Sequence, residues 1–451
     1  MTRGAHGRRS CQAPGAIIPV LAAGSALVCL LFAASAAADN APARDAGDLI
    51  EDPGLVLPER SFGVPRNWLN LVPDIRLPRR EQPLQFGALS APTPPLRADH
   101  QGVTARLGLA GEYRDNVFVA QDDTEDGYVL TATPGLQYVK QAPRWSVFAD
   151  YAFETARGVG GSEPSRSALT KAVNGQSATL SGLYRASPRT TLDFSNGFVE
   201  TRSVESAVIA AALPAFTRIR TNAIVATARH DLTPRTAMEG SYRNFLQFTS
   251  VSDQSTIVEH QGAASLTHRR TPHDRVSGRY QVQAIGFSRS EDAWAHDAAL
   301  IYERDFGERL SLRAVGGAIA TDADGGRLFP KYGGALSASA TNLVFTLDAE
   351  RILLSAAGVE DPVVLTQAGA ELVGRLGRGV QLVGRVERQW LTVLDGEDTE
   401  LTVTGGEARM TYAIGNHTWL WGQYRHRREE TSISTISSNF ALIGITRDFS
   451  F

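Results

Sequence analysis

The chain has 451 residues, of which 48 are acidic and 45 are basic, so its formal net charge is −3. A mildly acidic chain lacks the basic excess typical of nucleic-acid-binding proteins, and we predict no nucleic-acid partner. Both cysteines, Cys11 and Cys29, lie near the N-terminus. The rest of the chain therefore has no thiol chemistry, no disulfide and no cysteine metal site.

Residues 1–38 have the pattern of a secretory signal peptide. A basic stretch is followed by an apolar run at 16–32 and by three alanines at 36–38, which form a small-residue cleavage site. The alternatives are a retained membrane anchor and, less favoured, a lipoprotein acylated at Cys29, which follows Val28 rather than a small residue. We therefore predict that the chain leaves the cytoplasm.

Residues 39–101 form a proline-rich segment. Ten of the chain's 21 prolines lie here, and this density favours extended chain without helices. We predict a periplasmic segment. It is either a flexible leader or, because it carries apolar residues such as Trp68 and Phe86, a segment that lies in the mouth of the following domain or binds a periplasmic partner.

Residues 102–451 have the two-residue period of β-strands. Between Val103 and Tyr113 the odd positions are apolar or small, whereas Thr104, Arg106 and Glu112 occupy even positions. The same pattern recurs at 145–153, 276–284, 310–318 and 343–349. Many of these stretches run for ten residues or more, which suits tilted membrane strands of ~9–11 residues.

Short turns and long loops alternate along this region. The short turns are at 141–144, 187–189, 233–235, 271–273, 307–309, 340–342, 377–379 and 415–417. The longer polar loops are near 115–127, 157–171, 201–217, 249–256, 287–293, 321–331, 354–361, 394–400 and 429–435. Eight turns and nine loops connect about 18 strands, and this asymmetry is typical of an outer-membrane barrel.

The C-terminal strand supports the same prediction. Ile443, Ile445, Phe449 and Phe451 fall on one face, which Arg447 interrupts. This pattern resembles the closing strand that the bacterial barrel-assembly machinery recognises, and we predict that machinery as a partner. The alternative is an ordinary edge strand that happens to end in phenylalanine.

The first predicted hairpin resembles that of a known family. Residues 112–118 (Glu-Tyr-Arg-Asp-Asn-Val-Phe) and 127–136 (Gly-Tyr-Val-Leu-Thr-Ala-Thr-Pro-Gly-Leu) are similar to the opening hairpin of an outer-membrane β-barrel porin family associated with capsule and exopolysaccharide export. Arg114 and Thr133 stand where members typically have an acidic residue and a serine. The resemblance implies a barrel over 102–451. It also implies a pore that serves a periplasmic polysaccharide export protein.

The alternation assigns a set of charged side chains to the interior of this barrel. These lumen-lining candidates are Arg106, Glu112, Asp150, Glu239, Arg243, Arg279, Arg313, Asp348, Glu371, Arg385, Glu387, Glu407 and Arg409. Eighteen strands enclose an aqueous channel, mixed charge suits hydrated polar cargo, and arginine pairs well with carboxylates such as uronic acids. The alternative is a mutually neutralising wall without selectivity.

No motif indicates catalysis or a metal site. His-Glu-x-x-His and Gly-x-Ser-x-Gly are both absent, so we predict no enzyme, no cofactor and no metal. The alternative is a hydrolase whose triad assembles from distant strands. Acids cluster at 122–126, 322–324 and 395–398. We interpret them as solvated loop residues, the alternative being Ca²⁺ binding or divalent bridging to lipopolysaccharide.

We therefore predict an all-β, antiparallel up-and-down barrel in the cell outer membrane, surrounded by lipid and lipopolysaccharide. The predicted function is a passive conduit for export of a capsular or exopolysaccharide with periplasmic partners. One alternative is a general diffusion porin for small hydrophilic solutes, which a constriction loop folded inward would favour. The other is a non-transporting structural or surface barrel that presents loops such as 157–171 and 201–217.

Overall fold

The structure is a computed structural model. It describes residues 102–115, 126–162, 175–201, 218–249, 255–288, 290–307, 309–355, 361–376, 379–394, 400–414, 417–431 and 435–450. The predicted signal peptide, the proline-rich segment and Phe451 lie outside these residues, and the domain boundaries stay predictions. In the described ranges no helix has the length and apolar character needed to cross a membrane.

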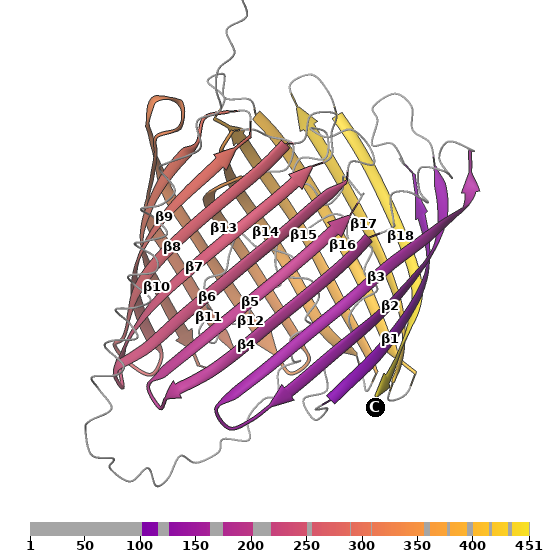
Figure 1. The fold of residues 1–451 in the computed structure, drawn as a ribbon, viewed down its shortest axis with the longest axis horizontal. Helices are drawn as coiled ribbons and strands as arrows, with labels where there is room; N and C mark the ends of the chain where they lie inside the picture. The colour runs from indigo at the N-terminus through magenta and orange to yellow at the C-terminus, as the bar shows by residue number, and fades with distance from the viewer. Residues whose placement is uncertain are drawn as a thin grey trace, which may run out of the picture. The chain divides into compact units, whose positions relative to one another are not determined.

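The strands form one antiparallel sheet of 18 strands (Figure 1). They are β1 (Gly102–Arg114), β2 (Gly127–Gln141), β3 (Trp145–Gly161), β4 (Gly175–Ser187), β5 (Thr190–Thr201), β6 (Ile219–Thr233), β7 (Thr236–Thr249), β8 (Ser255–Arg269), β9 (Asp274–Phe287), β10 (Ala293–Phe306), β11 (Leu310–Thr321), β12 (Arg327–Ala340), β13 (Leu343–Leu354), β14 (Val363–Leu376), β15 (Val380–Val393), β16 (Glu400–Ala413), β17 (Thr418–Thr431) and β18 (Thr435–Ser450). A 3-10 helix, η3 (Ala323–Gly325), follows β11.

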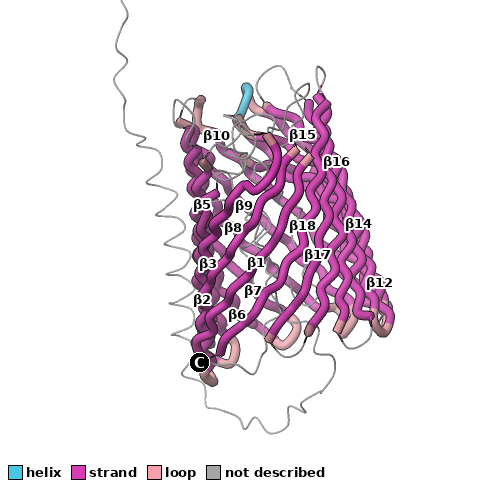
Figure 2. Tube along the Cα trace, turned by 90° about the vertical axis from the view of Figure 1, so that its right-hand side faces the viewer, coloured by secondary structure: helices cyan, strands magenta, loops and turns pink. Residues whose placement is uncertain are grey.

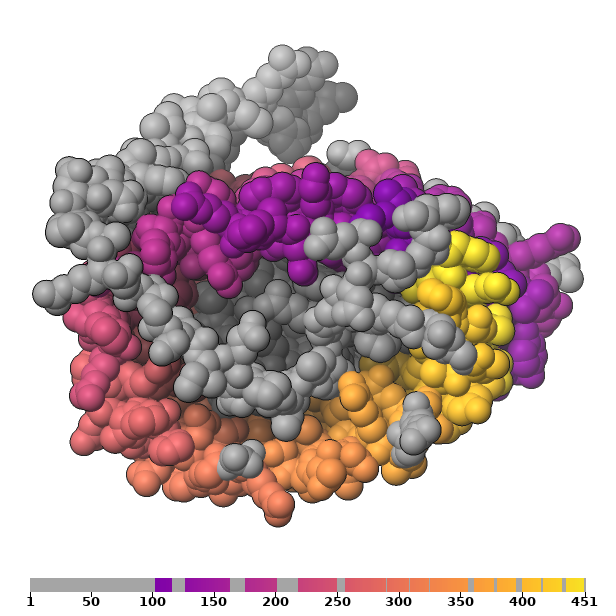
Figure 3. All heavy atoms as spheres, turned by 90° about the horizontal axis from the view of Figure 1, so that it is seen from below, coloured from indigo at the N-terminus to yellow at the C-terminus, as the bar shows by residue number. Residues whose placement is uncertain are grey.

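The sheet closes on itself because the first strand pairs with the last. Ala105 of β1 lies opposite Phe449 of β18, and the pairing continues to Arg114 and Phe440. The indigo and yellow ends of the described chain accordingly lie side by side in Figure 3. Closure gives each described strand a partner strand on both sides, which is the condition for a β-structure in lipid. The predicted closed up-and-down barrel is confirmed.

The connections differ in length at the two ends of the strands. At one end they are as short as 188–189 and 234–235, and these are the pink turns at the lower end of Figure 2. At the other end they include 162–174 and 202–218. We call these ends the short-turn end and the long-loop end. Short turns face the periplasm in outer-membrane barrels, so the long-loop end faces the outside.

Three of the predicted loops are shorter than expected because strands continue into them. Residues 157–161 belong to β3, residues 327–331 to β12 and residues 429–431 to β17. The extension of β12 contains Pro330, and a proline in the sequence favours a loop over a strand. Proline has no N–H to donate to a neighbouring strand. Pro330 is accommodated because β12 pairs with β13 only from Gly333 onward, so no residue of β13 needs a hydrogen bond from position 330.

The outer face of the barrel is apolar. In β1 the side chains of Leu107 and Leu109 are 41% and 49% exposed, whereas Glu112, on the alternate positions, is buried. Exposed aromatic residues occur near the short-turn end (Tyr138, Trp145, Tyr184, Phe306, Tyr412 and Phe449) and toward the long-loop end (Tyr128, Phe248 and Trp390). An apolar band between aromatic girdles is the surface of an outer-membrane barrel. The chain is an outer-membrane β-barrel.

Candidate functional site

The face opposite the exposed apolar side chains is polar, and we call it the polar face. All thirteen charged residues singled out in the sequence lie on it, at the alternate positions of strands whose other positions are exposed and apolar. Asp150, for example, precedes the exposed Tyr151, and Arg385 precedes the exposed Val386. Whether these residues contact a permeating solute stays a prediction.

An alternating row of acids and bases crosses four neighbouring strands of the polar face. Glu371 of β14 lies opposite Arg385 of β15, Arg385 lies opposite Glu407 of β16, and Glu407 lies opposite Arg425 of β17. The Arg425 Nε lies 3.5 Å from the Glu407 Oε2. The Gln423 amide donates a hydrogen bond to the other oxygen of Glu407 at 2.6 Å. Opposite charges thus face each other at every step of the row.

Two arginines of β17 were missed in the sequence. Arg425 and Arg427 are 6% and 3% exposed on the polar face, and Arg427 Nη2 lies 2.5 Å from Glu429 Oε1. The sequence Arg-His-Arg-Arg at 425–428 looks like a solvated basic run beside a loop. The period of two that begins at Trp421 was the available signal, because it places Gln423, Arg425 and Arg427 on one face.

Other predicted residues meet in smaller ion pairs. Arg106 Nε lies 3.0 Å from Asp448, and its Nη1 lies 4.0 Å from Asp150. Glu303 joins Arg275 at 3.1 Å and Arg313 at 3.9 Å. The structure therefore brings together some predicted residues, such as Arg106 with Asp150, and supplies partners that the sequence did not indicate.

The remaining predicted residues have polar neighbours within the wall. Glu112 pairs with Arg114, and Arg385 with Glu387 at 2.8 Å. Arg279 donates to Gln281 at 2.5 Å. Glu239 lies opposite Arg229 in the register. Asp348 and Arg409 also lie on the polar face, in β13 and β16.

The end of β13 turns into the barrel. Leu353, Leu354 and Ser355 are all buried, although side chains of a strand normally alternate between its two faces. The Ser355 hydroxyl donates a hydrogen bond of 3.0 Å to Glu259 of β8. Four strands, β9 to β12, separate β8 from β13. The chain at Ser355 therefore crosses part of the interior.

The carboxylate that receives Ser355 is almost completely buried. Glu259 is 1% exposed, and its Oε1 lies 3.4 Å from the Arg243 Nη1 of β7. A buried carboxylate needs a cation and hydrogen-bond donors to offset its lost hydration. Arg243 and Ser355 supply both. We call Arg243, Glu259 and Ser355 the cross-barrel triad.

Apolar side chains surround this triad at the long-loop end. Leu353 packs with Ala295, Ile319, Val364 and Leu394. Ala323 of η3 contacts that cluster and a second one formed by Ile257, Ile285, Phe287 and Ala293. The end of β13 and the connections after β11 and β15 therefore contribute apolar groups to the interior. The interior thus carries apolar groups at the long-loop end and charged groups closer to the short-turn end.

In the described ranges no group of three or more histidine, cysteine, aspartate or glutamate side chains is placed to hold a metal ion. Among the loop acids, the Asp322 carboxylate accepts a hydrogen bond of 2.6 Å from the Trp294 backbone N–H, so this acid fastens a loop to β10. The clusters near 122 and 395 lie largely outside the described residues. Absence of catalysis stays a prediction.

The predicted assembly residues lie at the closing strand. Ile443, Ile445 and Phe449 of β18 are 63%, 41% and 42% exposed on the outer face. Arg447 shares this face, and its guanidinium lies 5.3 Å from the centre of the Phe449 ring. Recognition by the assembly machinery stays a prediction.

Comparisons with known proteins find similarity only among solved structures. No protein-family model matches the chain, and no curated protein matches it. OpdO from Pseudomonas aeruginosa has a TM-score of 0.44 and 13% identity, covering 77% of this chain and 97% of that chain. A BenF-like porin from Pseudomonas fluorescens Pf-5 has a TM-score of 0.44 and 11% identity, covering 77% and 99%. OccAB4 from Acinetobacter baumannii has a TM-score of 0.39 and 12% identity, covering 78% and 99%.

Similarities of this size carry no functional conclusion, and the barrel is established by its own strand pairing. The barrel implied by the sequence resemblance is confirmed. The association of that family with capsule and exopolysaccharide export finds no support in these comparisons.

Proposed function

We propose that this outer-membrane channel is a passive diffusion porin for small hydrophilic solutes. The observation that carries the proposal is the hydrogen bond from Ser355 to Glu259, because it holds the residue that follows β13 against β8 inside the barrel. A chain segment folded inward is the feature that distinguishes a size-selective porin from a conduit for a polymer. Both alternatives share the same barrel, so the barrel alone does not favour one.

The polar face supplies what a hydrated solute needs during passage. Glu407, Arg425 and their neighbours offer acceptors and donors in alternation, so a solute that sheds water finds replacement hydrogen bonds on the wall. Charges of both signs lie within a few ångströms of each other, which limits the net field on the channel axis. Passage then needs no energy source, and the concentration gradient sets its direction.

Export of a capsular or exopolysaccharide was the preferred hypothesis from the sequence. It rested on the family resemblance, whereas the inward turn at the end of β13 favours the alternative. A periplasmic export partner remains a prediction, and the experiment below separates the two functions.

The test is solute entry into liposomes that contain the purified full-length chain. We expect swelling with monosaccharides and a steep fall with oligosaccharides of increasing size. Replacing 354–361 with two glycines removes the buried Leu354 and the Ser355 hydroxyl that binds Glu259, so the variant should admit larger oligosaccharides and conduct more current in planar bilayers. Shortening 162–174 by the same number of residues is the matched control, and it should leave the size limit unchanged.

Equal entry of short and long oligosaccharides into the wild-type liposomes would contradict the porin proposal and favour the polymer conduit. Deletion of the gene in its host provides the second arm. Loss of surface polysaccharide with normal solute uptake would also support the conduit, whereas reduced uptake with normal polysaccharide is the outcome expected of a porin.

A further inference from the structure

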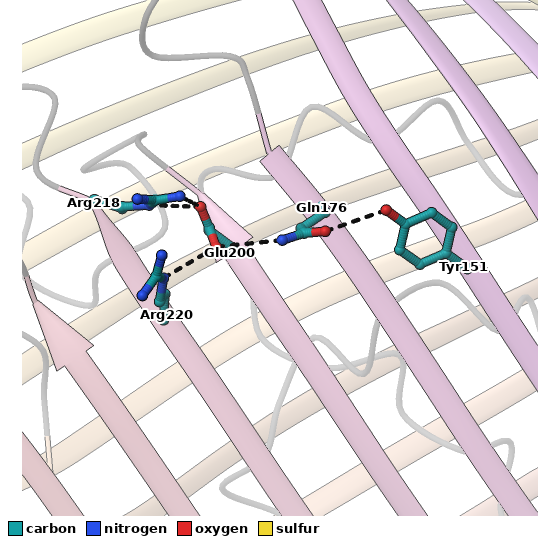
Figure 4. Close-up of polar contacts among 5 residues, drawn as sticks. All are labelled: Tyr151, Gln176, Glu200, Arg218 and Arg220. Carbon is teal, nitrogen blue, oxygen red and sulfur yellow. Dashed lines mark hydrogen bonds and ion pairs between the residues drawn. The ribbon is translucent and has the colours of Figure 1, made fainter.

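A polar cluster interrupts the outer face at the long-loop end of β3 to β6. It consists of Tyr151, Gln176, Glu200, Arg218 and Arg220 (Figure 4). Glu200 lies six residues after the exposed Phe194 of the same strand, so the two side chains share the outer face. Gln176 shares it likewise with the exposed Leu180. The cluster therefore faces the lipid rather than the lumen.

Two guanidinium groups converge on one carboxylate in this cluster. Arg218 donates to Glu200 Oε1 from its Nε at 2.6 Å and also from its Nη2. Arg220 donates from its Nε to Glu200 Oε2 at 3.1 Å. The Gln176 amide donates to the same oxygen at 3.4 Å, and the Tyr151 hydroxyl donates to the Gln176 carbonyl at 3.2 Å. The line of contacts thus spans four strands.

The two arginines are the exposed charged groups of the cluster. Arg218 and Arg220 are 37% and 48% exposed, whereas Glu200 is only 10% exposed. An external anion therefore meets the arginines and not the carboxylate.

The position of the cluster in the membrane selects the kind of anion. Arg220 is the second residue of β6, and Arg218 precedes the strand at the long-loop end. An arginine on the lipid face is unfavourable at mid-membrane and is tolerated near the interface. At this level the neighbours are the head groups of the outer leaflet. Arginine recognises phosphate through paired, charge-assisted hydrogen bonds.

We propose that Arg218 and Arg220 bind a phosphate group of lipopolysaccharide at the outer leaflet. Glu200 competes with the phosphate for the donors of the two guanidiniums, and Gln176 and Tyr151 hold Glu200 in place. This site is independent of solute diffusion, because it lies on the lipid-facing surface.

The experiment measures binding of bis-phosphorylated lipid A to the purified full-length chain in neutral detergent micelles, by native mass spectrometry. The double variant Arg218→Gln/Arg220→Gln should bind at least about tenfold more weakly, which corresponds to ~1.4 kcal/mol. Glu200→Gln removes the competing carboxylate, so it should bind lipid A more tightly than the wild type. Because the two variants are expected to change affinity in opposite directions, a general loss of folding cannot imitate the result.

Arg304 offers a matched control at the short-turn end. It is also 48% exposed on the outer face and lies 3.6 Å from the Asp274 carboxylate, which accepts a hydrogen bond from Tyr302. Arg304→Gln should leave lipid A binding within about twofold, a change of ~0.4 kcal/mol.

The affinity of the wild type for dephosphorylated lipid A should be no higher than the affinity of the double variant for bis-phosphorylated lipid A. Equal binding by the wild type and the double variant would overturn the proposal. Displacement of lipid A by an equal concentration of inorganic phosphate would overturn it as well, because the site would then recognise free phosphate rather than the lipid. Weaker binding by Glu200→Gln would contradict the assigned role of Glu200.

Discussion

Charged side chains on the polar face are stable because they neutralise one another. Arg427 and Glu429 are each only 3% exposed, and Arg427 Nη2 lies 2.5 Å from Glu429 Oε1, so each supplies a charge that offsets the hydration the other has lost. Breaking such a pair leaves one charge buried without compensation, and this costs far more than losing an exposed pair. The ion pairs of the polar face therefore help to stabilise the barrel.

Glu407→Ala should destabilise the barrel by about 3–5 kcal/mol, because it removes the partner of the buried Arg425 and an acceptor of Gln423. Urea unfolding in micelles, followed by tryptophan fluorescence, measures this change. Glu430→Ala is the matched control, since Glu430 pairs at 2.6 Å with Arg428, whose side chain is 53% exposed. Its effect should stay below ~1 kcal/mol. Equal effects of the two variants would show that burial of the pair is unimportant.

Much of the polar face could be predicted from local sequence, because a strand exposes alternate residues to opposite faces. Arg106 and Glu112 were assigned by this period alone, and the register of β1 with β18 keeps it without a break. The same period also places Arg425 and Arg427 on the polar face, but it is hard to recognise there because a run of charges occupies both faces of β17. Equal polarity on the two faces removes the contrast on which the period depends.

The seam between β17, β18 and β1 depends on one close packing contact. Trp421 is 2% exposed, and its indole N–H donates to the Thr446 hydroxyl at 3.2 Å. Gly444 lies opposite Trp421 in β17 and opposite Ala110 in β1. A Cβ at residue 444 would lie 2.5 Å from the indole and 2.6 Å from the Leu109 carbonyl oxygen. The strands approach this closely only with glycine.

Gly444→Ala should therefore destabilise the barrel by about 1–3 kcal/mol, because either Trp421 or the β1 backbone must shift. Gly422→Ala is the control within the same seam, since a Cβ there would lie at an ordinary 3.8 Å from the Leu442 carbonyl oxygen. The melting temperature of the folded, fast-migrating form on gels measures both. A Gly444→Ala barrel as stable as the Gly422→Ala barrel would show that the seam is more adaptable than its geometry indicates.

The inward turn after β13 could not be predicted from the sequence. Ser355 and Glu259 are separated by 96 positions, and neither belongs to a motif. Their contact follows from the curvature of the closed sheet, which brings β8 and β13 to opposite sides of one interior region. Local patterns determine strands and turns, whereas the direction in which a loop folds depends on groups that only the closed barrel brings together. A porin and a polymer conduit therefore have the same strand and turn pattern at the level of sequence.

The whole barrel depends on pairing its most distant strands. Residues of β1 and β18 that lie opposite each other are more than 300 positions apart, as with Arg106 and Asp448. Bringing such ends together has a large entropic cost, so closure is expected late in folding. An exposed recognition element on the last strand would allow assembly to begin there. Ile443, Ile445 and Phe449 form an apolar row of that kind on the outer face of β18.

Phe449→Ala should lower the amount of folded barrel in the outer membrane of the host and leave refolding of the purified chain in detergent nearly unchanged. The physical reason is that the predicted contact of Phe449 with the assembly machinery exists only in the cell, whereas in both settings Phe449 faces an apolar medium in the final state. Phe345→Ala is the matched control. Phe345 is 41% exposed on the outer face near the short-turn end of β13, against 42% for Phe449. Equal losses for the two variants in cells would mean that the closing strand carries no special signal. A loss for Phe449→Ala in detergent as large as in cells would assign the residue to barrel stability instead.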